Sequence, residues 1–241
     1  MTRLPVLDIT VRSYAFLWQE RRILALPMLI LILLMAVIPN PADPGIDDWL
    51  TILIAASPTA LFMPAFEVGL FRRILLGEPR RHFALFCLNR ALVTYSVAGL
   101  KLFLYLAMAA IPAAILLSMS FYDSLEEDAA TTVSAAAYAG LFFGGLALLL
   151  IIRLVLVLPA AATGTAITFR EASGLAKGNG MRLIAIVALT VAPLLIIPAA
   201  MPLPLLAAIL QALAVPVRAM ALALSYRLLT EPAVSEASAV P

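Results

Sequence analysis

Residues 133–154, VSAAAYAGLFFGGLALLLIIRL, contain no charged side chain before Arg153. A helix needs roughly 17 to 25 apolar residues to cross about 30 Å of hydrocarbon, and this stretch has that length. It is therefore predicted to be a membrane-spanning helix. The whole chain has a matching composition, because 64% of its 241 residues are hydrophobic and only 12% are charged. With a mean hydropathy of +1.07, the chain is not expected to be a soluble enzyme, a nucleic-acid-binding domain, a coiled coil or a disordered protein.

Five other stretches have the same apolar character, so we predict an all-α membrane protein, a polytopic bundle of six transmembrane helices. The predicted spans are residues 23–39, 49–71, 101–119, 133–154, 183–201 and 204–225. Together they make a single transmembrane domain over residues 1–227. The remainder, residues 228–241, is rich in Ala, Ser, Glu and Pro and is predicted to be a mobile cytoplasmic tail.

The charges between the spans separate by sign. The gaps 40–48 and 121–132 carry acidic residues and no Lys or Arg, whereas the 16 basic residues lie in the other connections or near that end of a span. Because basic residues mark the cytoplasmic side of a membrane protein, both termini are predicted to be cytoplasmic. The net charge of +2 therefore conceals a strongly basic cytoplasmic face.

The stretch before the first span is predicted to form an amphipathic helix that lies in the membrane interface. Val11, Tyr14, Ala15 and Trp18 fall on one helical stripe. Such a helix places Trp18 at the level of the lipid headgroups.

A second interfacial helix is predicted before the fifth span. Thr168 and Glu171 have the spacing of a capping box, and Lys177 with Gly178 supplies a basic last turn and a glycine cap. The residues assigned to the two interfacial helices are Arg12, Trp18, Arg21, Arg22, Arg170, Glu171 and Lys177.

Each predicted hairpin of spans follows a basic cytoplasmic stretch, and residues 9–12, ITVR, resemble residues 167–170, ITFR. The chain is therefore either three copies of one unit or three hairpins without a common origin. The middle stretch, residues 79–99, is either a third interfacial helix or a cytoplasmic extension of the third span. The sequence leaves both alternatives open.

Four ionisable residues lie at or within the spans, namely Glu67, Lys101, Arg153 and Arg218. A charge in hydrocarbon costs at least about 2.5 kcal/mol, so each is a candidate functional residue. One hypothesis is a lipid phosphate held between the three cations. The alternative is structural, with Glu67 paired to Arg153 or Arg218 and the remaining cations extended toward the headgroups.

Small residues recur four apart in the fourth span, at Ala136, Gly140 and Gly144. Such a face lets another helix approach closely, either within the bundle or in a homo-oligomer. Several spans also contain proline, which removes a backbone donor and leaves a carbonyl that a structural kink or a solute could use.

The chain has one cysteine, Cys87, and one histidine, His82. This excludes an internal disulfide and the usual zinc, haem and iron–sulfur ligand sets. We predict no metal site, no cofactor and no catalytic residues, and hence no enzyme activity.

Residues 169–183, FREASGLAKGNGMRL, resemble bacterial membrane proteins grouped with the membrane domain of glycerophosphoryl diester phosphodiesterases. These proteins carry Glu-Ala, then Lys/Arg-Gly-Asn, then Arg-Leu at the start of a transmembrane helix, and residues 73–78, RILLGE, are similar to their first cytoplasmic connection. The chain departs from the pattern at Gly174 and Met181, where aromatic residues are usual, and at Ala176, where Ser or Thr is commoner. The phosphodiesterase activity of that family belongs to a separate barrel domain, which we do not expect in these residues. The resemblance implies a helical domain of a bacterial inner membrane without catalysis.

We therefore expect a non-enzymatic, membrane-organising or accessory protein of a bacterial inner membrane. Its basic cytoplasmic face would engage anionic phospholipids, a protein partner or a second copy of the chain, and no nucleic acid. The alternative is a small transporter or channel subunit with a polar pathway near Glu67, Arg153 and Arg218.

Overall fold

The computed structural model of the chain is all-helical, which confirms the predicted fold class at that level. It describes residues 3–37, 49–78, 90–126, 135–165, 167–200 and 204–231, in which nine helices are found. The helices are α1 (Val6–Gln19), α2 (Arg21–Val37), α3 (Trp49–Leu76), α4 (Arg90–Glu126), α5 (Ala135–Leu154), α6 (Val157–Thr163), α7 (Phe169–Leu175), α8 (Gly180–Ala200) and α9 (Pro204–Thr230).

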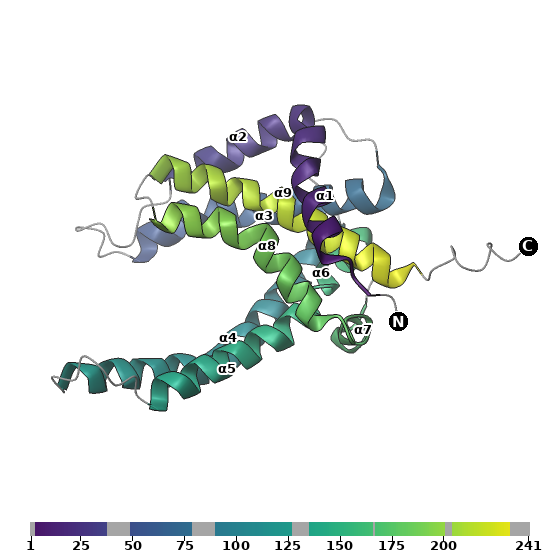
Figure 1. Cartoon of the computed structure of the whole chain (residues 1–241). Helices are drawn as coiled ribbons and strands as arrows, with labels where there is room; N and C mark the ends of the chain where they lie inside the picture. The colour runs from purple at the N-terminus through teal and green to yellow at the C-terminus, as the bar shows by residue number, and fades with distance from the viewer. Residues whose placement is uncertain are drawn as a thin grey trace, which may run out of the picture.

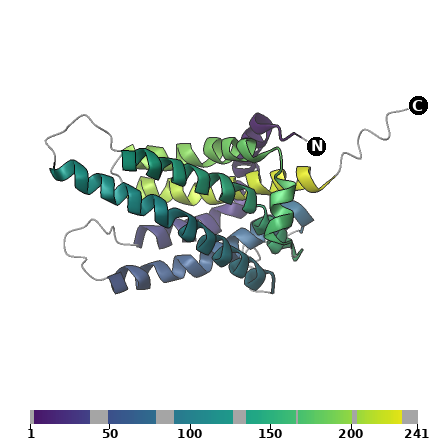
Figure 2. The same ribbon diagram turned by 90° about the horizontal axis from the view of Figure 1, so that it is seen from below.

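The long helices form three hairpins whose joined ends point to the same side of the molecule (Figure 1). Figure 1 shows that the helix ends joined within the α2–α3, α4–α5 and α8–α9 hairpins lie on the left. The start of α1, helix α7 and the end of α9 lie on the right. The view from below in Figure 2 shows the same arrangement. The three hairpins therefore have the same orientation, and the sides of the membrane on which their ends lie stay a prediction.

Two helices of the described part of the chain are long and apolar enough to cross a membrane. These are Arg90–Leu116 within α4 and Leu205–Thr230 within α9. A third span results if α7 and Gly180–Leu194, which are bent by 89° from one another, count as one. These candidate spans indicate a membrane protein. The number six stays a prediction, although a helix occupies each of the six predicted stretches.

Three helices extend beyond their predicted spans. Helix α4 contains 37 residues and ends at Glu126, inside the gap that was expected to be a loop. Helices α3 and α9 continue to Leu76 and Thr230, so the predicted tail begins with helical residues. A helix satisfies its own backbone hydrogen bonds in water as well as in lipid, so the end of an apolar run does not have to end the helix.

Helix α9 is the central element, because it packs against α1, α2, α3, α6 and α8. Its contact surface contains buried alanines, including Ala212, Ala219, Ala221 and Ala223. Small side chains allow close approach of helix backbones, which is a main source of packing energy in membranes. This explains how one helix can contact five others.

Helix α1 is fastened to the start of α8 and to α9. The backbone N–H of Leu4 donates to Oδ1 of Asn179 at 3.1 Å, and Arg182 donates to the carbonyl of Leu4 at 3.2 Å. Ile9 and Phe16 are buried in the two main apolar clusters. A helix therefore lies where the sequence predicts one, and one of its faces is part of the protein core; its place in a membrane interface stays a prediction.

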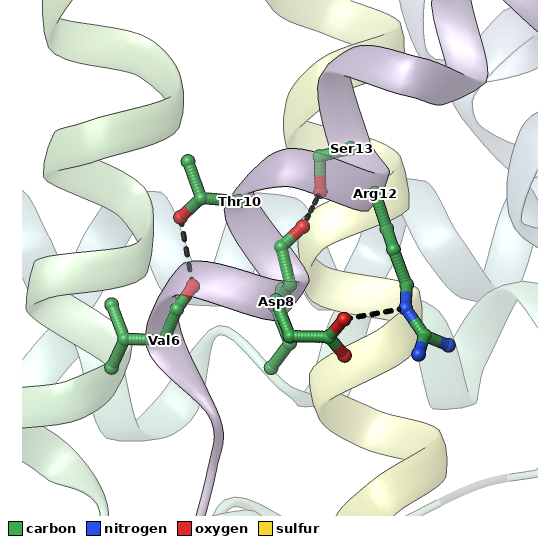
Figure 3. Close-up of polar contacts among 6 residues, drawn as sticks. Val6, Asp8, Thr10, Arg12 and Ser13 are labelled. Carbon is green, nitrogen blue, oxygen red and sulfur yellow. Dashed lines mark hydrogen bonds and ion pairs between the residues drawn. The ribbon is translucent and has the colours of Figure 1, made fainter.

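The polar side chains of α1 are largely satisfied within the helix itself (Figure 3). The hydroxyls of Thr10 and Ser13 donate to the carbonyls four residues earlier, at 2.9 and 2.7 Å. Arg12 pairs with Asp8 at 2.9 Å on the exposed side. Ser13 can therefore be fully buried without an external partner for its hydroxyl.

Tyr14 joins the middle of α1 to the middle of α8. Its hydroxyl lies 2.9 Å from the carbonyl oxygen of Thr190 and 3.3 Å from that of Leu189. Pro193 has no N–H, so the carbonyl of Leu189 lacks its normal intrahelical donor. Burial raises the pKa of the Tyr14 phenol, which keeps it protonated as a donor. The proline in this span is thus compensated by a neighbouring helix.

We expect Tyr14→Phe to lower the free energy of unfolding by about 1 kcal/mol, the net value of one hydrogen bond. In a Pro193→Ala background the amide at position 193 can bond to Leu189, so the same change should cost less than half as much. Denaturant unfolding in detergent micelles measures both differences. Equal costs in the two backgrounds would contradict this role of Tyr14.

The sequence analysis predicted α7 and missed α6. The capping box is confirmed, because the Glu171 N–H donates to Thr168 Oγ1 at 3.2 Å and the Thr168 N–H donates to Glu171 at 2.6 Å. Helix α7 ends at Leu175 with Ala176 as its cap, so Lys177 lies beyond its last turn and the predicted basic last turn is wrong; Gly178, further along, has a left-handed φ of +78°. Helix α6 has seven residues, about two turns, and is largely buried; it ends at Thr163, and its cap Gly164 has a φ of +86°. Its first-turn Pro159 was the available signal, since proline is tolerated there.

Candidate functional site

Three helices bring polar side chains together in the core. Glu67 of α3 accepts hydrogen bonds from Arg218 of α9 and from the hydroxyl of Tyr95 of α4. Glu67 and Tyr95 are 6% and 5% exposed, whereas the Arg218 side chain is 40% exposed. Both carboxylate oxygens have a donor, one each.

The segment that carries Glu67 is buried on all sides. Phe66, Val68 and Leu70 are fully buried, and they belong to the same apolar cluster as Tyr95. The rings of Phe71 and Tyr95 lie 6.1 Å apart at an angle of 43°. A helix that is apolar all round belongs in a core, so the charge of Glu67 is placed where water cannot solvate it.

Glu67, Tyr95 and Arg218 together are called the Glu67 cluster. Its buried environment determines its chemistry. A buried carboxylate must be neutralised or paired, and here a guanidinium and a phenol satisfy it. The cluster therefore ties α4 to α3 and α9 at a point where the α4–α5 hairpin departs from the other helices (Figure 1). Arg153 and Arg218 were the two predicted partners of Glu67, and the structure pairs it with Arg218.

Tyr95 is the member that sequence reasoning missed. It lies in a long apolar helix, where an aromatic residue is most simply interpreted as packing or as an interfacial residue. The available signal was chemical, because a buried phenol and a buried carboxylate each need a partner.

Two further ion pairs lie at the end of α3. Arg73 contacts Glu20 at 2.7 Å, which joins this end to the junction of α1 and α2. Arg72 pairs with Glu78 and donates to the carbonyl of Ala162 in α6 at 3.5 Å. Arg72 and Arg73 therefore have structural partners and are less available to a ligand.

The other intramembrane cations lie in different places. Arg153, at the end of α5, lies against the start of α8, where a Cβ on Gly180 would come within 3.1 Å of its Nε atom. Lys101 lines a pocket between α4, α6 and residues 167–169 whose lining contains neither Arg153 nor Arg218. Of the four candidates, the structure thus brings together Glu67 and Arg218.

The residues assigned to interfacial helices lie mostly at the surface. Arg12, Arg21 and Trp18 are exposed, and the guanidinium of Arg21 lies 4.3 Å from the centre of the Trp18 ring. The remaining ones, Arg22, Arg170, Glu171 and Lys177, are also exposed. They lie on α1, at the start of α2, on α7 and just after α7.

The small-residue face of α5 packs within its own hairpin. A Cβ on Gly144 would lie 3.9 Å from the Cβ of Ala113 in α4, and Gly140 is buried. The side chain of Ala136 lies outside the described residues, as do His82 and Cys87. Close packing of α4 against α5 therefore accounts for Gly144.

Searches of protein-family models, curated proteins and solved structures find no match for this chain. The resemblance of residues 169–183 to the membrane domain of glycerophosphoryl diester phosphodiesterases therefore stays a prediction.

Proposed function

We propose that this chain is a non-enzymatic protein of a bacterial inner membrane that binds anionic lipids through its basic cytoplasmic end, in an organising or accessory role. The observation that carries the proposal is the outer face of α1. Leu7, Val11 and Trp18 lie on one stripe of this helix and are 74%, 66% and 72% exposed. Three large apolar side chains in a row are poorly suited to water and well suited to the acyl-chain boundary of a membrane.

The charges beside this stripe support an anionic surface as its counterpart. Arg12, Arg21 and Arg22 are exposed on α1 and at the start of α2, and Arg170 and Lys177 are exposed on α7 and just after it. Each cation near an anionic membrane surface contributes about 1 kcal/mol. Hydrogen bonds of Leu4 and Tyr14 hold α1 to the start and the middle of α8. Lipid that binds this face of α1 is therefore attached to the packed helices.

Trp18 offers a direct test, because the chain has only two tryptophans. In a Trp49→Phe background, we expect brominated phosphatidylglycerol in lipid nanodiscs to quench Trp18 fluorescence at a lower mole fraction than brominated phosphatidylcholine. Replacing Arg12, Arg21, Arg170 and Lys177 by glutamine should reduce this preference at least about tenfold, since about 1 kcal/mol is lost per cation.

The matched control replaces the three arginines of this set by lysine, which keeps every charge. It should retain the preference for phosphatidylglycerol. Two results would overturn the proposal: equal quenching by the two lipids in the Trp49→Phe protein, or a glutamine variant that keeps the preference for phosphatidylglycerol. Native mass spectrometry of the same samples then shows whether a protein partner is retained instead.

A further inference from the structure

A pocket of about 340 Å³ lies between α4, α6 and the start of α7. Most of its wall is apolar, and a single charged side chain, Lys101, contributes to it. The lining residues are Thr94, Val97, Ala98, Lys101, Val157, Ala161, Ile167, Thr168 and Phe169.

Lys101 is the group in this wall that is available to bind an anion. The hydroxyl of Thr94 donates to the carbonyl of Arg90 at 3.0 Å, and that of Thr168 is engaged with Glu171. Among the described residues, Lys101 forms neither an ion pair nor a hydrogen bond. Lys101 is exposed and lines the pocket, and no described residue engages the hydrogens of its ammonium group, which can donate to a ligand.

The sequence predicts that the third span begins at Lys101, which places this side chain near the cytoplasmic boundary of the membrane. The 37 residues of α4 extend over about 55 Å, far more than the roughly 30 Å of the hydrocarbon layer. Lys101 is the charged residue of α4 between Arg90 and Asp123, and Tyr105, one turn further, is 54% exposed. Tyrosine favours the interface of a bilayer. The ring of Tyr105 contacts that of Phe169 edge-to-face at 5.2 Å, so the start of α7 lies at the same level.

We propose that this pocket binds one anionic phospholipid, with its phosphodiester on Lys101 and an acyl chain along the apolar wall. The inference rests on the proposed function and names the specific lipid site of the protein. The apolar wall continues onto the exposed face of α4, where Val97, Leu104 and Met108 are 46%, 52% and 72% exposed. A bound acyl chain would cover this face.

The nearby acid selects against free phosphate. Hydrogen bonds from the backbone and side chain of Thr168 lower the pKa of the Glu171 carboxyl, which is therefore ionised beside the pocket. A phosphodiester carries one negative charge and inorganic phosphate carries more, so repulsion by Glu171 favours the diester. The apolar wall likewise stabilises only a ligand that has an apolar part.

The chain contains two lysines, Lys101 and Lys177, which makes the site testable by amine labelling of the intact protein. Lys177 is exposed between α7 and α8 and reports on the general effect of a negative surface. In nanodiscs that contain phosphatidylglycerol, we expect labelling of Lys101 to slow about tenfold relative to phosphatidylcholine, and by clearly more than labelling of Lys177.

Native mass spectrometry supplies the second measurement. The unsubstituted protein and Lys101→Arg should retain one tightly bound phosphatidylglycerol, and Lys101→Gln should lose it. Equal labelling of Lys101 in both lipids, or retention of the lipid by Lys101→Gln, would overturn the site. Protection of Lys101 by millimolar inorganic phosphate in phosphatidylcholine nanodiscs would assign the pocket to free phosphate and overturn it too.

These results are distinguishable from those of the proposed function. If Trp18 prefers phosphatidylglycerol but Lys101 is not protected, the pocket fails and the lipid-binding end remains. If neither residue distinguishes the two lipids, both proposals fail.

Discussion

Replacing Arg218 by leucine is expected to lower the free energy of unfolding by about 3 kcal/mol, the lower end of the cost of breaking a buried ion pair. The carboxylate of Glu67, which is 6% exposed, would keep only the hydrogen bond from Tyr95. The lower end applies because the Arg218 side chain is 40% exposed and its charge is partly screened. Unfolding of the purified protein in mixed micelles measures the difference.

The control and the second variant separate charge from packing. Arg153→Leu removes an exposed cation near the end of a helix and should change stability by less than about 0.5 kcal/mol. The double variant Glu67→Gln/Arg218→Leu carries no unpaired charge and should recover more than half of the loss. If Arg218→Leu were as stable as Arg153→Leu, the Glu67 cluster would not hold α3, α4 and α9 together.

Phe66→Ala is expected to lower the free energy of unfolding by about 3 to 4 kcal/mol, the usual cost of removing a buried aromatic ring. Phe66 is fully buried, with 0% of its surface exposed to solvent, and the centre of its ring lies 6.4 Å from that of Phe62. In a membrane protein the loss arises mainly from packing, because the unfolded helices remain in lipid.

The matched variant is Phe103→Ala on α4, where the side chain is 63% exposed. It removes the same ring from a surface and should cost less than about 0.5 kcal/mol. The same unfolding assay compares the two. A similar cost at both positions would show that residues 65–71 are not the buried centre of the fold.

The helices could be predicted from the sequence because their signals are local. A long apolar run satisfies its own backbone hydrogen bonds only as a helix, and the described residues of all six predicted stretches are helical. The capping box of Thr168 and Glu171 was equally predictable, since its two hydrogen bonds join residues three apart. The extent of α4 was not, because the apolar run ends at residue 119 and the helix at Glu126.

The partners of the polar groups could not be predicted, because they are far apart in the chain. Tyr95 and Arg218 reach Glu67 from 28 and 151 residues away. Tyr14 reaches the carbonyl of Thr190 from 176 residues away. Composition predicts that each buried polar group needs a partner, and only the packing of helices selects which one it has.

The sequence by itself determined that the chain is helical and apolar, where its helices lie and that its charges separate by sign, because these depend on the length and composition of single segments. The tertiary structure alone decided that α1 gives one face to the core and leaves Leu7, Val11 and Trp18 outside. It also decided that Arg218 neutralises Glu67, whereas Lys101 forms no ion pair with the described residues and lines an apolar pocket. The physical reason is that contacts between helices depend on how their surfaces fit together, and hydropathy contains no information about that fit.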